Sequence, residues 1–125
     1  MRLARRLRRE RDQTGLTASQ RAALVTLEQF GPRTLGQLAS FEQITPPSMT
    51  RIVNSLEVSG LVSRGTNDED ARQIVIALTP VAEELLAEAH RQEDRWLAAR
   101  IDQLTGSERR ALRQSVAVMA RIVAS

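Results

Sequence analysis

Residues 34–79 decide the fold, and they read TLGQLASFEQITPPSMTRIVNSLEVSGLVSRGTNDEDARQIVIALT. Thr34 and Gln37 form a capping-box pattern, in which a hydroxyl and an amide satisfy free backbone N–H groups at a helix start. The pattern predicts a short helix with one buried stripe, made of Leu35, Leu38 and Ala39. Residues 41–44 are expected to form the turn that follows this helix.

Thr45 begins a second predicted helix as its cap, with Pro46 at the first position, where a missing N–H costs nothing. Apolar residues then recur at i, i+3, i+4 and i+7 and are expected to face the core: Met49, Ile52, Val53 and Leu56. Gly60 is expected to end the helix. This spacing turns the other side chains outward or toward the flanks: Pro47, Ser48, Thr50, Arg51, Asn54 and Ser55.

Two short apolar runs, Leu61-Val62 and residues 74–76, lie on either side of a polar loop at residues 67–72. Apolar or β-branched runs that flank a polar loop predict a β-hairpin. A helix pair followed by a hairpin is how a small domain places one helix in a DNA major groove. The hairpin loop then lies against the neighbouring backbone.

The outer face of the second predicted helix supplies the candidate DNA contacts. Arginine donates two hydrogen bonds to a guanine edge, while Ser, Thr and Asn bond to bases or phosphates. An arginine in the hairpin loop is placed to enter a minor groove, where negative potential is concentrated. The predicted DNA-binding residues are Pro47, Ser48, Thr50, Arg51, Asn54, Arg64 and Arg72.

Each candidate also has an ordinary structural interpretation. The helix face is alternatively a solvated surface, and Arg64 alternatively forms a surface ion pair. For Arg72 the alternative is a salt bridge with Asp70, which we expect to stabilise the wing.

Charge alone does not identify the DNA-binding region. The chain carries 18 basic and 15 acidic residues, a net charge of +3, and every basic residue is arginine. Residues 1–16 hold six arginines and two acids, residues 17–78 hold five and six, and residues 79–125 hold seven of each. The middle segment is therefore slightly acidic, so a DNA-binding hypothesis depends on where particular arginines point.

Two helices are predicted before this region. Thr17 and Gln20 form another capping box, which predicts a helix that ends at Gly31-Pro32. An arginine-rich opening helix is interrupted at residues 14–16. Its arginines are expected to belong to a dimer element, paired or solvated, and the alternative is additional phosphate contacts. Association with a membrane surface is disfavoured, because only Leu3 and Leu7 provide apolar anchorage.

Two more helices are predicted after the hairpin. The first runs from Pro80 to about Gln103, and a Thr105–Glu108 capping box begins the second. A helix of about 25 residues spans roughly 37 Å, too long for a small lobe to cover its apolar positions. The last helix extends this apolar surface with Leu112, Val116, Met119, Ile122 and Val123. These surfaces favour a dimer over a monomer with a folded-back helical pair.

The predicted fold is mainly α with a small β-hairpin wing, one compact domain in three parts. Residues 1–16 form an N-terminal dimerisation helix, residues 17–79 a winged helix-turn-helix DNA-binding lobe, and residues 80–125 the C-terminal dimerisation helices. The long helices are expected to form the dimerisation region.

Composition argues against catalysis and against a metal site. The chain has no Cys and one His, His90, and a lone imidazole is a poor start for a metal site. The consecutive acids at residues 68–70 lie in a loop, and their carboxylates are not expected to converge on one metal ion or one reacting group. No apolar run approaches a membrane span, and the N-terminus lacks the apolar core of a signal peptide. We therefore expect a soluble cytoplasmic protein that is no enzyme and binds no metal, cofactor or membrane.

Residues 34–79 resemble the winged helix-turn-helix of the MarR family of bacterial transcriptional regulators. PSMTRIV at residues 47–53 resembles the recognition helix, and GLVSR at residues 60–64 resembles its exit into the wing. Residues 70–79 match the wing signature D-x-R-x-x-x-x-x-L-T. The resemblance extends from Leu16 through the last two helices.

The resemblance implies that Ser48, Thr50 and Arg51 contact DNA from the recognition helix and Arg72 from the wing. Many members place a second basic residue immediately before the wing arginine, whereas this chain has Ala71. A weaker grip on the minor groove is expected.

The resemblance further implies a homodimeric, sequence-specific regulator of double-stranded DNA. Such a protein is expected to repress a palindromic operator with half-sites about one helical turn apart, and to be released by a small, often aromatic, ligand. Two alternatives stay open. One is an architectural winged-helix protein with little sequence specificity, and the other is a winged helix used as a protein-interaction module.

Overall fold

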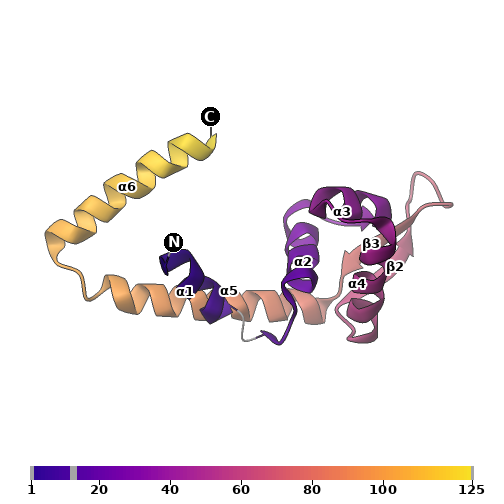
Figure 1. The fold of residues 1–125 in the computed structure, drawn as a ribbon, viewed down its shortest axis with the longest axis horizontal. Helices are drawn as coiled ribbons and strands as arrows, with labels where there is room; N and C mark the ends of the chain where they lie inside the picture. The colour runs from indigo at the N-terminus through magenta and orange to yellow at the C-terminus, as the bar shows by residue number, and fades with distance from the viewer. Residues whose placement is uncertain (1, 12–13, 125) are drawn as a thin grey trace.

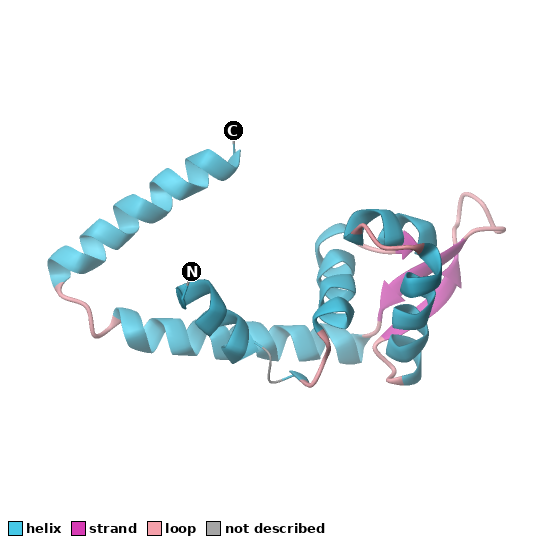
Figure 2. Cartoon of the chain, viewed as in Figure 1, coloured by secondary structure: helices cyan, strands magenta, loops and turns pink. Residues whose placement is uncertain are grey.

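A long helix carries a lobe at one end and a projecting helix at the other in the computed structural model, which describes residues 2–11 and 14–124 (Figure 1). The helices are α1 (Arg2–Arg11), α2 (Ala18–Phe30), α3 (Leu35–Glu42), α4 (Pro46–Val58), α5 (Pro80–Ile101) and α6 (Gly106–Ala124). The strands are β1 (Arg33–Thr34), β2 (Val62–Thr66) and β3 (Ile74–Leu78). Figure 2 shows that the strands lie only in the lobe, which confirms the mainly helical fold with a small wing. Residues 1 and 12–13 of the predicted N-terminal part lie outside the described residues.

The predicted caps begin the helices. The Thr17 and Thr34 side chains each accept a hydrogen bond from the backbone N–H three residues later and complete a capping box with a glutamine. The Thr45 and Thr79 side chains accept the equivalent backbone hydrogen bond at the starts of α4 and α5, and each is followed by a proline. Because each of these hydrogen bonds joins residues only three positions apart, the local sequence determines where each helix begins. The helix starts at the two ends of the lobe, those of α2 and α5, are set in this way.

The hairpin is part of a three-stranded sheet in the order β1-β3-β2. β2 and β3 pair antiparallel with Val62 opposite Leu78, as the predicted hairpin requires. β1 was not predicted: Arg33 lies opposite Ile76 and Thr34 opposite Val75. A strand of two residues carries no period-2 pattern, and Thr34 already serves as the cap of α3.

Two predicted helix boundaries are wrong by about two residues. Phe41 and Glu42 continue α3 instead of forming the turn, because each is held against α2: the Phe41 ring lies 4.9 Å from that of Phe30, and Glu42 accepts a 2.6 Å hydrogen bond from the Thr26 hydroxyl. The helix ends instead at Gln43, which adopts φ 55°. Likewise α5 ends at Ile101 rather than near Gln103.

One face of α4 packs into the core of the lobe, and the opposite face is exposed to solvent. Met49, Val53 and Leu56 of α4 are buried, as predicted, while Ile52 is only partly buried at the edge. They pack with buried side chains of α2, α3, the β2–β3 hairpin and the start of α5: Ala23, Leu24, Leu27, Leu38, Ala39, Leu61, Val62, Ile76, Ala82 and Leu86. Since the inner face is committed to this core, the opposite face of α4 is oriented outward.

Outside the lobe, α1 packs on α5. The Arg6 guanidinium lies 5.4 Å from the centre of the Trp96 ring and also pairs with Glu10 at 2.9 Å. Arg100 approaches the same ring at 5.5 Å. A guanidinium over an indole face is attracted by the ring quadrupole, so the contact of Arg6 with Trp96 helps to hold α1 on the long helix.

A network of ion pairs on the exposed side of α5 lowers the pKa of Glu88. Arg91 donates to Glu84 at 2.6 Å and to Glu88 at 2.9 Å, while Arg95 donates to Glu88 at 2.9 Å. Hydrogen bonding from Arg91, then from Gln92, holds the pKa of the Glu88 carboxyl below its ordinary value. The stabilisation this carboxylate contributes is present above its unfolded pKa and is lost as the pH falls through its folded pKa.

We therefore expect Arg91→Gln to raise the pKa of Glu88 more than Arg95→Gln does, because Arg91 makes the larger contribution. Carboxyl-carbon NMR titration of the two variants measures the difference. Equal shifts would contradict the assignment to the Arg91 hydrogen bond.

Candidate nucleic-acid interface

The outer face of α4 carries small polar groups whose hydroxyls are partly engaged. The Thr50 hydroxyl donates to the carbonyl of Pro46 at 2.9 Å, so its oxygen remains available as an acceptor. The Thr45 hydroxyl donates to Ser48 Oγ at 3.0 Å, which leaves the Ser48 proton free to donate outward. Pro47 is exposed between them. The first two turns of α4 therefore present one donor and one acceptor suited to a polar ligand edge.

Arg51 is the free cation of this face. Its side chain is exposed and makes no hydrogen bond or ion pair with any residue that the structure describes. A guanidinium with its fork unoccupied can bind guanine O6 and N7 through two parallel hydrogen bonds. Among the predicted residues on α4, Arg51 is the one best prepared for base contact.

Asn54 and Arg64, both predicted DNA contacts, bind each other instead of pointing freely outward. Arg64 of β2 donates to Asn54 Oδ1 at 2.6 Å and to Glu57 Oε2 at 3.0 Å, both on α4. This is the surface ion pair that sequence reasoning gave as the alternative for Arg64. The bonds hold the base of the wing against the C-terminal half of α4. Glu57 was not among the predicted site residues.

The loop of the wing is held by its own side chains, with Arg72 extended from it. Asp70 Oδ1 accepts hydrogen bonds from the Arg72 backbone N–H at 3.0 Å and from Arg72 Nε at 3.2 Å. Asn67 donates to the Gln73 side chain at 2.8 Å across the loop. The Arg72 side chain is 92% exposed, so its terminal amino groups point to solvent while Nε is anchored. Asp70 thus restricts Arg72 without burying its charge.

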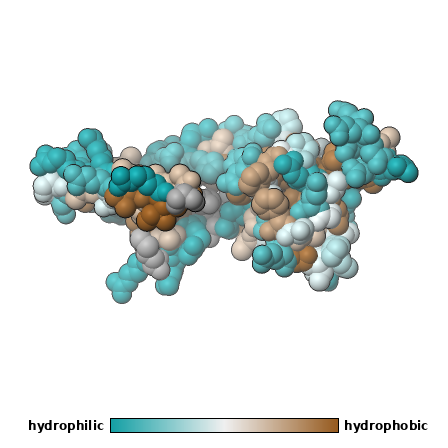
Figure 3. All heavy atoms as spheres, turned by 90° about the horizontal axis from the view of Figure 1, so that it is seen from above, coloured by the Kyte–Doolittle hydropathy of each residue, from teal (hydrophilic) through white to brown (hydrophobic). Residues whose placement is uncertain are grey.

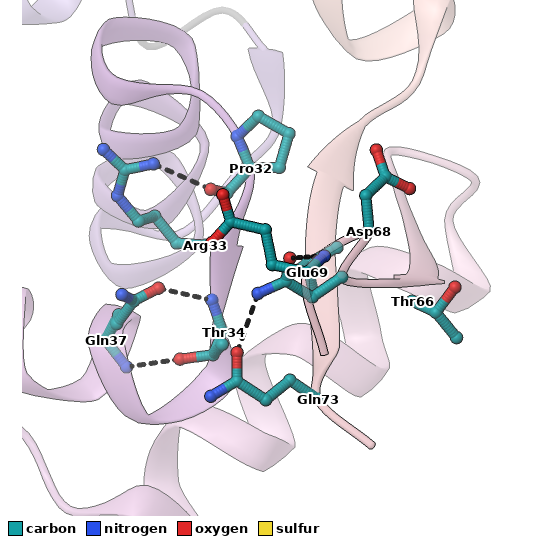
Figure 4. Close-up of a pocket in the computed structure, with 10 residues that line it drawn as sticks. Pro32, Arg33, Thr34, Gln37, Thr66, Asp68, Glu69 and Gln73 are labelled. Carbon is teal, nitrogen blue, oxygen red and sulfur yellow. Dashed lines mark hydrogen bonds between the residues drawn. The ribbon is translucent and has the colours of Figure 1, made fainter. Parts of the chain in front are cut away.

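A cavity of about 520 Å³ lies between β1, the start of α3 and the wing (Figure 4). Arg33, Asp68 and Glu69 contribute the charges of its lining, and Arg33 donates to the Pro32 carbonyl at 2.8 Å. No group of three metal-ligating side chains is assembled anywhere in residues 2–11 and 14–124. The pocket is polar and shapes the flank of the wing, and Arg33 is a lobe cation that sequence reasoning did not select.

The wing is mostly hydrophilic, while apolar side chains are exposed on several other elements. In Figure 3 the wing at one end is mostly hydrophilic, whereas apolar atoms show both on the lobe beside it and in a patch toward the opposite end. Val58 of α4 and Ile74 of β3 are exposed in the lobe. The largest group of exposed large apolar side chains belongs to α6: Val116, Val118, Met119, Ile122 and Val123. The candidate interface comprises the outer face of α4 and the polar wing, where α4 and β2 are in contact.

Comparison with known proteins identifies this architecture. The model of the MarR family matches residues 16–74. An HTH-type transcriptional regulator of Mycobacterium bovis, Mb0904, is 39% identical over 98% of this chain and 86% of its own length. A counterpart in Mycobacterium leprae, ML2140, is 37% identical over the same shares. The chain belongs to the MarR family.

Solved structures agree with this membership at the level of the fold. The transcriptional regulator Tm0710 of Thermotoga maritima superposes with a TM-score of 0.85 at 19% identity, covering 99% of this chain and 93% of that one. MepR of S. aureus, in its F27L mutant, superposes with a TM-score of 0.75 at 21% identity over 98% of this chain and 90% of that one.

Family membership confirms the predicted winged helix-turn-helix fold and the prediction of a DNA-binding transcriptional regulator. It does not test the individual contacts, so the roles of Pro47, Ser48, Thr50, Arg51, Asn54, Arg64 and Arg72 stay predictions. None of the described helices of this MarR-family chain is long and apolar enough to cross a membrane.

Proposed function

We propose that two copies of this MarR-family chain form a homodimer that binds a palindromic operator and blocks promoter access. The observation that carries the proposal is Arg51 on the outer face of α4, which is exposed and makes no hydrogen bond or ion pair with any described residue. A structural neighbour, the F27L mutant of S. aureus MepR, is bound to an oligodeoxyribonucleotide, which supports DNA as the ligand of this fold. A dimer doubles the number of contacts and reads half-sites about one helical turn apart.

The apolar side of α6 supports the dimer. None of the described residues of α6 is buried within the single chain. Ile122 is 68% exposed and Val123 is 85% exposed. A contiguous apolar patch is costly to leave in water and marks an interaction surface. In the proposed dimer, α1, α5 and α6 of the two copies cover one another.

Release by a small ligand completes the proposal. MarR-like proteins commonly leave DNA when a small, often aromatic, molecule binds between the DNA lobe and the dimer helices, and we extend this regulation to the present chain. A panel of aromatic carboxylic acids, added to the protein–operator complex in a gel-shift assay, tests it. Retention of the complex with the whole panel would count against aromatic acids as the effector class.

Selection of genomic fragments with the purified protein, followed by footprinting, tests the DNA-binding proposal. We expect a palindrome protected on one DNA face, and an affinity for it at least about 1,000-fold above that for a scrambled duplex. A ratio near one at every salt concentration would favour the architectural alternative. No binding to either duplex would favour a protein-interaction module.

Ala71 offers a gain-of-affinity prediction at the wing. Ala71→Arg restores the second basic residue that many MarR-family wings carry, next to the exposed Arg72. We expect tighter operator binding and a salt dependence whose log–log slope steepens by about two for the dimer, because each of its two wings releases the counterion of one more phosphate. Ala71→Gln is the uncharged control. An unchanged slope would show that residue 71 does not approach the DNA backbone.

A further inference from the structure

Two capping boxes in the lobe have the same geometry, but one of them makes an additional contact. In each, the glutamine Oε1 accepts the N-cap backbone N–H at 2.9 Å, and the threonine hydroxyl accepts the glutamine N–H at 3.1 Å. Gln20, at the start of α2, also donates from Nε2 to Ser55 Oγ of α4 at 3.0 Å. Gln37, at the start of α3 (Figure 4), makes no bond beyond its box to any described residue.

Ser55 is prepared to receive this bond. Its hydroxyl proton is donated to the carbonyl of Ile52 at 2.7 Å, so its oxygen is oriented as an acceptor toward Gln20. Gln20 is in turn held by the Thr17 backbone N–H. The link therefore runs from the backbone of the first turn of α2, through two side chains, to the backbone of α4.

The link complements a second one on the other flank of α4. There, Arg64 of β2 bonds Asn54 and Glu57. The apolar core holds the inner face of α4, but hydrophobic contact is non-directional. Hydrogen bonds are directional and weaken steeply when misaligned. The two polar links are thus the contacts best suited to limit rotation and sliding of α4 over its core.

We propose that Gln20 is a positioning residue for DNA reading, which orients α4 by holding Ser55. The inference rests on the proposed function, since it takes α4 as the helix that reads the operator. Arg51 lies four residues before Ser55, one helical turn away. A rotation of α4 would therefore displace its guanidinium from a base edge. Contacts to phosphate tolerate such displacement better than bidentate base contacts do, so specificity should suffer more than general affinity.

A double-mutant cycle tests the link: Gln20→Ala, Ser55→Ala and the double variant, each measured on the selected operator and on a scrambled duplex. We expect each single variant to bind the operator about five-fold more weakly, because the reading orientation of α4 is then only partly populated and the apparent affinity falls with that fraction. The double variant should be no weaker than the singles, because one bond is lost only once. Affinity for the scrambled duplex should stay unchanged.

Gln37→Ala is the matched control, because it removes an equal capping box that makes no bond to α4. It should lower the melting temperature as Gln20→Ala does and leave the affinity for the operator within two-fold of wild type. Equal losses of operator binding in the two variants would assign the effect to helix capping and overturn the inference. Unchanged binding in Gln20→Ala, or losses that multiply in the double variant, would overturn it as well.

Hydrogen exchange of the α4 backbone, measured without DNA, separates this inference from the proposed function. Gln20→Ala and Ser55→Ala should each speed exchange in the last two turns of α4, whereas Gln37→Ala should not. Failure of the wild-type protein to distinguish operator from scrambled DNA would contradict the proposed function. Unchanged exchange in both variants would contradict the link itself.

Discussion

Replacing Met119 by aspartate is expected to convert the dimer into monomers and to weaken operator binding by at least about 100-fold, the loss that follows when two linked binding events become independent. Met119 is half exposed in the single chain, on the apolar side of α6. In a two-fold interface the substitution buries two unpaired carboxylates, each of which must be dehydrated without compensation. Light scattering gives the mass, and gel-shift titration gives the operator affinity.

Gln114→Asp is the matched control for this substitution. Residue 114 is exposed on α6 and lies about 140° around the helix from residue 119, at 100° per residue. It introduces the same residue into the same helix, so the loss of helix propensity is equal. We expect it to remain dimeric with wild-type affinity. A dimeric Met119→Asp variant would place the interface elsewhere, and monomeric wild-type protein would contradict the proposed assembly.

The second large effect concerns Arg51. Arg51→Ala is expected to cost about 1–3 kcal/mol on the operator and to relax discrimination at one base pair per half-site. The exposed guanidinium has no hydrogen-bond or ion-pair partner in residues 2–11 and 14–124, so its removal should change stability little. Titration against operators with single base-pair changes measures both the affinity and the position that is no longer read.

Two further variants distinguish base reading from phosphate contact. Arg51→Lys keeps the charge but loses the planar fork that binds guanine bidentately, so it should keep binding to scrambled DNA and lose discrimination. Arg33→Ala removes a lobe arginine that bonds Pro32 at the flank of the wing, and it should spare the specificity ratio. Equal losses for Arg51→Ala on operator and scrambled duplexes would assign Arg51 to phosphate.

For some residues of the candidate site the sequence predicted whether the side chain points outward or is bonded to another element, and for others it did not. The outward orientation of Arg51 followed from the spacing of Met49, Val53 and Leu56, because a helix has only one face opposite its buried stripe. The engagement of Arg64 with Asn54 and Glu57 did not, since it depends on how closely β2 returns to α4. The distance between two neighbouring elements decides whether an arginine on one of them is exposed to solvent or bound to a carboxylate on the other.

Local chemistry also predicted where the helices begin, whereas their ends were less accurate. Thr34 bonds the backbone N–H of Gln37, so the start of α3 is legible within four residues. The end of α3 is set by the packing of Phe41 on Phe30 and by the bond from Thr26 to Glu42, both from a different helix. A pattern read along one segment contains no information about such a neighbour.

By itself, the sequence determined the capped helices, the inward stripe of α4, the hairpin and the family, because each depends on residues at most a few turns apart or on a motif in fixed order. Only the tertiary structure decided the pairing of β1 with β3, the ion pair of Arg64 and the bond from Gln20 to Ser55. The last of these joins residues 35 positions apart. Gln20 and Gln37 occupy equivalent places in identical local motifs, so only the packing of α2 against α4 gives Gln20 its partner.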